Sequence, residues 1–136
     1  RSTQAKTLFP YTTLFRSPAA VKDYLNLKLA AEPNEVFAIV FLNSMHEVLA
    51  YEPMFKGTVH STTVHARPIL QRALELNAAA VILSHQHPSG CTEPSSADRA
   101  LTQTLRAALS LIDVRVLDHL IVGQGTPYSF AESGLL

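Results

Sequence analysis

The sequence predicts a single α/β domain with three layers, in which helices flank a mixed β-sheet. Apolar runs typical of buried strands alternate with segments whose apolar residues recur at helical spacing. Some strand-like runs are joined by short turns, which favours antiparallel hairpins, and others are separated by helices. The chain has 136 residues, of which 47% are hydrophobic and 16% charged, so it can bury one core but is short for two.

The first segment of the chain is unlike the rest. Residues 7–17 (TLFPYTTLFRS) resemble a translated sequencing-library adapter, and they lack the apolar stretch and cleavage site of a secretory signal. We therefore expect residues 1–17 to be non-native or disordered. The domain is expected to span residues 18–136.

The first half of this domain predicts a helix, a hairpin, a helix and a buried strand. Ser17 and Pro18 supply an N-cap and a first-turn proline for a helix that reaches about residue 31. Residues 36–42 are a nearly continuous apolar strand, with residues 46–55 as the hairpin partner. Residues 68–76 have helical periodicity, and residues 78–84 form an apolar strand expected at the centre of the sheet.

The second half predicts one long helix and a final pair of strands. Ser95 and Asp98 have the spacing of a capping box, and the apolar stripe that follows continues to residue 112. Residues 114–122 are strand-like, and residues 128–130 are placed to pair back along them after a glycine-rich turn.

The pattern with the clearest chemistry is His85-Gln86-His87, followed by Asp98. Alternate residues of an extended segment point to the same side, so both imidazoles can reach one ion. Asp98, at the start of the next helix, would be a third ligand. Three protein ligands that leave one position for water are typical of a hydrolytic zinc centre. Two plainer interpretations compete: histidines bonded to backbone carbonyls, and an Asp98 that only caps its helix.

Several separated segments resemble one known family. Residues 52–58 (EPMFKGT), 73–80 (ALELNAAA), 85–90 (HQHPSG) and 117–123 (LDHLIVG) look like the RadC family, which belongs to the JAMM (MPN-type) class of JAB-domain metalloproteases. The likeness covers residues 18–136 and is closest to short members without an N-terminal helix-hairpin-helix region. It implies a cytidine-deaminase-like fold.

The resemblance also implies a site and a reaction. His85, His87 and Asp98 match the ligands of one Zn²⁺ per chain, Glu52 the general base, and Ser95 a serine near the reacting centre. A metal-activated water would attack an amide carbonyl, which implies a metallopeptidase or isopeptidase.

Two of these roles have competitors in the sequence. Glu52 would otherwise be a solvated strand carboxylate, with Glu47 as a rival base, and Ser95 would otherwise be only an N-cap. Cys91 departs from the family pattern, and its thiolate is a competing metal ligand in an alternative hypothesis. Within 117–123, Asp118 or His119 is expected either to orient a ligand histidine or to form a structural pair.

Composition restricts the partners. Eleven basic and eleven acidic residues give a net charge of zero, so we expect a peptide or protein substrate and no strong autonomous binding of nucleic acid. No apolar run approaches the roughly 18 residues of a membrane span. With one cysteine, the protein is expected in the reducing cytoplasm. The alternative function is a non-catalytic interaction module, associated with DNA repair or mobile elements, in which the metal site is structural.

Overall fold

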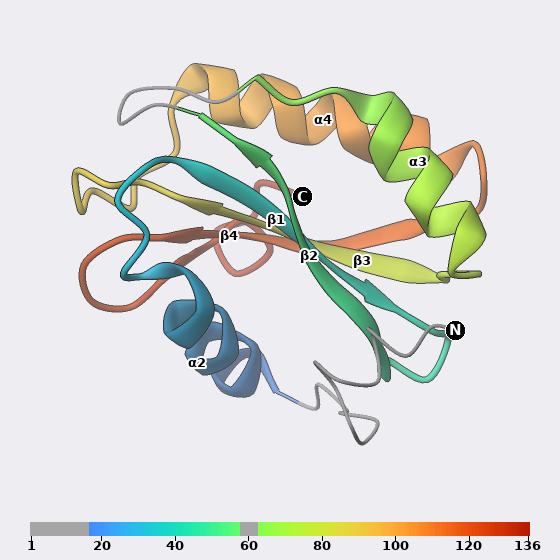
Figure 1. The fold of residues 1–136 in the computed structure, drawn as a ribbon, viewed down its shortest axis with the longest axis horizontal. Helices are drawn as coiled ribbons and strands as arrows, with labels where there is room; N and C mark the ends of the chain where they lie inside the picture. The colour runs from blue at the N-terminus through green and yellow to red at the C-terminus, as the bar shows by residue number, and fades with distance from the viewer. Residues whose placement is uncertain (1–16, 58–62) are drawn as a thin grey trace.

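The structure is a computed structural model that describes residues 17–57 and 63–136. The elements follow one another along the chain in the order α2 (Pro18–Leu29), β1 (Val36–Leu42), β2 (Val48–Lys56), α3 (Ala66–Glu75), β3 (Ala80–Gln86), α4 (Ser96–Ser110), β4 (Arg115–Val122) and β5 (Tyr128–Ser129) (Figure 1). The expectation for residues 1–16 lies outside the described residues. Ser17 is described, and its side chain caps α2 as predicted by accepting from Ala20 N.

The sheet has the strand order β2-β1-β3-β4-β5. Strand β1 is antiparallel to both of its neighbours, β3 and β4 are parallel, and β5 is antiparallel to β4. The parallel step occurs where α4 crosses over between two strands, as a βαβ connection requires. The mixed sheet is therefore confirmed, and β3 occupies its centre.

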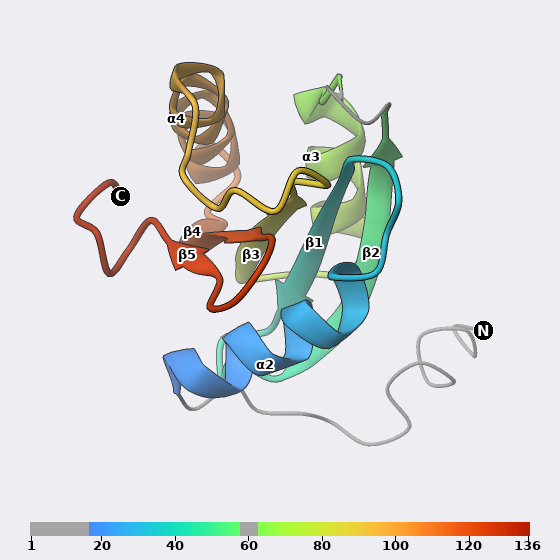
Figure 2. The ribbon, with the colours of Figure 1, turned by 90° about the vertical axis from the view of Figure 1, so that its left-hand side faces the viewer.

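Helices cover both faces of this sheet, which confirms the three layers. Helix α2 lies on one face, and α3 and α4 lie on the other (Figures 1 and 2). All seven residues of β1 are buried, and they alternate between two cores. Val36, Ala38 and Val40 pack on the α2 side, whereas Phe37 and Ile39 pack on the side of α3 and α4. This alternation decides which polar side chains share a face.

The main difference from the predicted elements is at the end of β3. The strand was expected to stop at residue 84, but it continues to Gln86 because both neighbours supply pairing partners. His85 is opposite Phe37 of β1 and Ile121 of β4. The first histidine is consequently held within the sheet, and only His87 lies beyond it.

None of the helices in residues 17–57 and 63–136 combines the length and the hydropathy that a bilayer crossing needs.

Candidate metal centre

Strand alternation gathers three polar side chains on the α4 side of the sheet. Glu35 directly precedes β1, and the antiparallel register pairs Val36 with Gln86, so Glu35 lies level with His87. His85 and His87 share this face, as predicted from their spacing. Gln86 points to the other face, where its amide donates to the backbone oxygen of Glu32 at 2.6 Å.

The three side chains form a compact cluster. Glu35, His85 and His87 each offer one ligand atom, and these atoms all lie within 4.8 Å of one another. His85 Nε2 contacts Glu35 Oε1, and the rings of the two histidines are 4.7 Å apart between centroids. Glu35 and His85 are buried, with 7% and 5% exposure. Buried acidic and imidazole groups in such contact could hold a metal ion.

Asp98 completes the cluster from the start of α4. Its Oδ1 lies 3.2 Å from His85 Nδ1 and its Oδ2 lies 3.4 Å from His87 Nε2. Among the described residues, the buried His85 Nδ1 makes no hydrogen bond despite this proximity. The structure thus brings His85, His87 and Asp98 together. A metal ion could be the missing partner of the buried His85 Nδ1. The nitrogen and carboxylate donors fit a divalent transition metal.

The charge on Asp98 is strongly favoured. Burial acts most strongly on the pKa of Asp98 and would raise it, but the adjacent His85 and His87 and the backbone N–H of Ser95 together lower it well below its usual range. A carboxylate that is ionised in this way carries its negative charge at any physiological pH.

His87 is oriented by the loop that follows it. Its Nδ1 lies 2.8 Å from the carbonyl oxygen of Cys91, which can only accept, so Nδ1 carries a proton and Nε2 holds the lone pair in the neutral ring. Nε2 is the atom that faces Asp98. Cys91 therefore contributes through its backbone. Its thiol is exposed and is not one of the clustered ligand groups among the described residues.

Metal uptake should depend on the protonation of His87. The hydrogen bond to Asp98 raises the pKa of His87, and burial opposes this less strongly. The raised value means that the His87–Asp98 pair stabilises the metal-free fold below about pH 6.5 and that this stabilisation is lost as pH rises through the folded pKa. We expect metal affinity to increase with pH and to level off only above the raised pKa of His87, which is higher than the ordinary value of about 6.5. Competition with a chelator at a series of pH values tests this expectation, and a metal affinity independent of pH would contradict it.

Two glycines allow the His87 loop to pack against the end of β4. His87 N donates to Val122 O at 2.8 Å, and Gln124 N donates to Gly90 O at 2.9 Å. Gly90 has a φ of +89°, and a Cβ on Gly123 would lie 2.6 Å from Gly90 O. Side chains at these positions would force the two loops apart, so the glycines help to fix His87.

The structure does not bring Glu52 to the cluster. Glu52 Oε2 accepts from Arg72 Nε of α3 at 2.7 Å, and Glu52 is paired with Ile39, four residues beyond Glu35 along the direction of β1. At the rise per residue of a β-strand, four residues correspond to a separation of about 13 Å along the sheet. Its rival Glu47 accepts from the Asn43 amide in the β1–β2 turn. Glu35 was not identified as a site residue from the sequence. The feature that could have indicated it is a charged residue directly before a fully apolar strand.

Ser95 and Asp98 form the predicted capping box. Ser95 Oγ accepts from Asp98 N at 3.0 Å, and Asp98 Oδ2 accepts from Ser95 N at 2.8 Å. The Ser95 residue is exposed, and its hydroxyl hydrogen is still able to donate. Asp98 is therefore both a cap and a neighbour of both histidines.

Ser95→Ala should lower the free energy of unfolding by about 1 kcal/mol, because the N-cap hydroxyl is lost. Metal affinity should be retained, since the Asp98 side chain still accepts from Ser95 N. Urea denaturation measures the first effect, with Ser96→Ala as the neighbouring control. Equal stability of the two variants would show that the cap contributes nothing.

Asp118 has a structural role. Its Oδ1 accepts from His119 N and Ala131 N, and its Oδ2 accepts from Ser129 Oγ at 2.6 Å. These bonds attach the C-terminal segment to β4. Two roles were expected for the Asp118-His119 pair, namely orienting a ligand histidine or supporting the fold. The hydrogen bonds of Asp118 are those of a residue that supports the fold.

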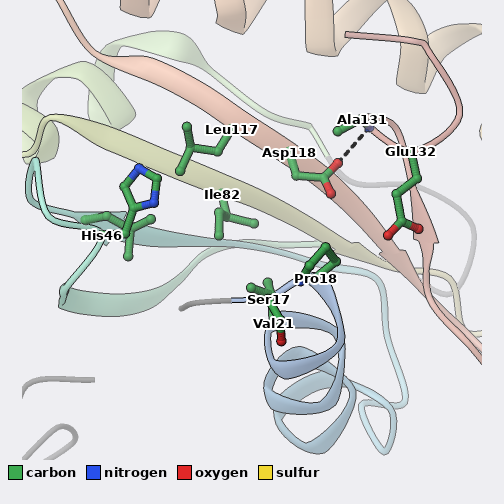
Figure 3. A pocket seen from close by; sticks show the side chains of 10 residues that line it. Ser17, Pro18, Val21, His46, Ile82, Leu117, Asp118, Ala131 and Glu132 are labelled. Atoms are coloured by element: carbon green, nitrogen blue, oxygen red, sulfur yellow. Dashed lines mark hydrogen bonds between the residues drawn. The ribbon is translucent and has the colours of Figure 1, made fainter. Parts of the chain in front are cut away.

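A separate pocket of about 240 Å³ lies on the α2 side of the sheet (Figure 3). Val21, Ile82 and Leu117 line it together with Asp118, whose bond to Ala131 is visible there. Ile82 belongs to the core on the α2 side, whereas His85 points to the other face, so this pocket is not part of the metal cluster.

Comparison with known proteins gives the family. The model of the RadC-like JAB domain matches residues 15–135. The chain belongs to the RadC family. This match confirms the resemblance seen in the sequence, and the observed α/β fold agrees with a JAB domain.

Curated RadC relatives are similar over most of this chain. A UPF0758 protein of Methylibium petroleiphilum is 59% identical over 125 residues, which are 92% of this chain and 56% of the relative. UPF0758 proteins of Leptothrix cholodnii and Variovorax paradoxus are each 58% identical, over 90% and 91% of this chain and 55% of each relative. The chain thus spans about half the length of the curated relatives it matches.

Proposed function

We propose that this RadC-like domain is a zinc-dependent hydrolase of the JAMM type that cleaves an amide bond in a peptide or protein. The proposal rests chiefly on the buried convergence of Glu35, His85 and His87, with Asp98 beside both imidazoles. A cluster that served only to stabilise the fold would not need so many ionisable groups in one buried place, because each costs free energy to desolvate.

His85, His87 and Asp98 would hold the ion. Two imidazole nitrogens and one carboxylate oxygen form a ligand set that suits Zn²⁺ and leaves a position for water. His85 Nδ1, which makes no hydrogen bond among the described residues, and the lone pair on His87 Nε2 both face Asp98, so donors from β3, from the loop after it and from α4 converge. When bound, zinc would supply a Lewis acid and an acidified water.

We assign proton transfer to Glu35 rather than to Glu52. The Glu35 carboxylate contacts His85 inside the cluster, whereas the Glu52 carboxylate is engaged by Arg72 on α3. Glu35 would accept a proton from the attacking water at a carboxylate oxygen and pass it to the leaving amine. The exposed Ser95 hydroxyl would donate to the developing oxyanion.

The test has two parts. Purified protein should contain about one zinc per chain by elemental analysis. A peptide-library digest should then show cleavage that a chelator abolishes and added zinc restores. Protein without bound transition metal would overturn the proposal at its first step. A full zinc complement with no cleavage of any library peptide would instead support the interaction module with a structural metal.

A further inference from the structure

A second buried histidine lies behind the cluster and has no place in the proposed chemistry. His119 of β4 is fully buried, and its Nδ1 lies 2.6 Å from Oγ1 of Thr102 on α4. Thr102 is also fully buried, and its Oγ1 lies 2.7 Å from the backbone oxygen of Asp98. A chain of polar contacts therefore runs from the sheet to the residue that caps α4.

The direction of these hydrogen bonds follows from counting protons. The carbonyl oxygen of Asp98 can only accept, so the single hydroxyl hydrogen of Thr102 is donated to it. Thr102 Oγ1 must then accept from His119, which places the ring proton on Nδ1. His119 Nε2 is left with a lone pair, and among the described residues it has no hydrogen-bond partner.

Aromatic contacts fix the orientation of the His119 ring. It stacks on Phe130 with a centroid distance of 4.6 Å and an interplanar angle of 17°, and Phe37 meets it nearly edge-on at 5.6 Å. The ring of His85 lies 6.3 Å away at 28°. An apolar ring would fill this space without burying an unsatisfied nitrogen, which costs free energy. The presence of an imidazole here therefore indicates that the hydrogen bond from its Nδ1–H to Thr102 has a role.

We propose that His119 and Thr102 are positioning residues that hold the first turn of α4 so that Asp98 stays beside His85 and His87. A threonine bond to the carbonyl four residues earlier is common within helices. The donation from His119 is different because it ties that turn to β4, the strand parallel to the one that carries His85. The inference rests on the proposed metal site, in which Asp98 is a ligand.

The test compares zinc affinities of folded variants by competition with a chromophoric chelator. Thr102→Val and His119→Phe should each weaken zinc binding by about 10-fold, the lower end for partners behind a metal ligand. The double variant should bind zinc about as weakly as each single variant, about 10-fold below wild type, because both changes break the same chain of hydrogen bonds. Thr102→Ser keeps the hydroxyl and His119→Asn keeps a donor near Nδ1, so both should retain most of the affinity.

Ser110→Ala is the matched control. The Ser110 hydroxyl also donates to a carbonyl of α4, that of Ala107 at 2.8 Å, but at the far end of the helix. Its loss should leave zinc affinity unchanged. Unchanged affinity in folded Thr102→Val, or effects of the two single variants that add fully, would overturn the inference.

Amide hydrogen exchange separates this inference from the proposed function. In the metal-free protein, exchange at the first turn of α4 should be faster in Thr102→Val than in wild type or Thr102→Ser, since the turn loses its attachment. Wild-type protein that takes up no zinc would overturn the proposed function alone, and the exchange comparison would still decide whether the pair holds this turn. Equal exchange in all three would overturn the positioning role.

Discussion

Glu35→Gln is expected to reduce kcat of zinc-loaded protein by about 10²- to 10⁴-fold, the usual contribution of a general acid–base group. The amide keeps the shape of the side chain but cannot accept a proton. Zinc content should be retained, because His85, His87 and Asp98 are unchanged. Steady-state cleavage of the best library peptide, with metal content measured on the same sample, checks both expectations.

Glu52→Gln is the matched control, since it makes the same chemical change on the same face of the sheet. Glu52 is engaged by Arg72, with side-chain exposures of 27% and 35%, so the change should cost only about 0–1 kcal/mol of stability. Activity should be close to wild type. The opposite pattern, with Glu52→Gln inactive and Glu35→Gln active, would return proton transfer to the residue that the sequence indicated.

Asp98→Asn is expected to weaken zinc binding by at least about 100-fold, the upper end of the effect seen for groups that merely support a ligand. Asparagine caps helices about as well as aspartate, so α4 should still begin at the same place. The loss would therefore report the missing anionic oxygen and not a frayed helix. Zinc competition and helix content by circular dichroism measure the two effects separately.

Ser95→Ala provides the reciprocal comparison for Asp98→Asn. It removes one half of the capping box and keeps the carboxylate, so stability should fall while zinc is retained. If Asp98→Asn bound zinc as tightly as wild type, Asp98 would be only a cap, which was the competing interpretation of its position.

The sequence by itself determined the elements and most of the candidate ligands. Periodicity located strand 36–42 and the helix after Ser95, because apolar alternation and capping chemistry are local properties. The spacing of His85 and His87 likewise predicted a shared face, since side chains of an extended segment alternate. Their meeting with Asp98 follows from a short connection between adjacent elements.

Only the tertiary structure decided which acid joins the histidines. Glu35 lies fifty residues before His85 in the chain and reaches it through the antiparallel pairing of β1 with β3, which no local pattern specifies. Glu52 is also on the correct face, but the register of β2 places it farther along the sheet, within reach of Arg72. Strand order and register depend on how the whole core packs, so the proposed general base and the His119–Thr102 attachment could not be identified from local patterns alone.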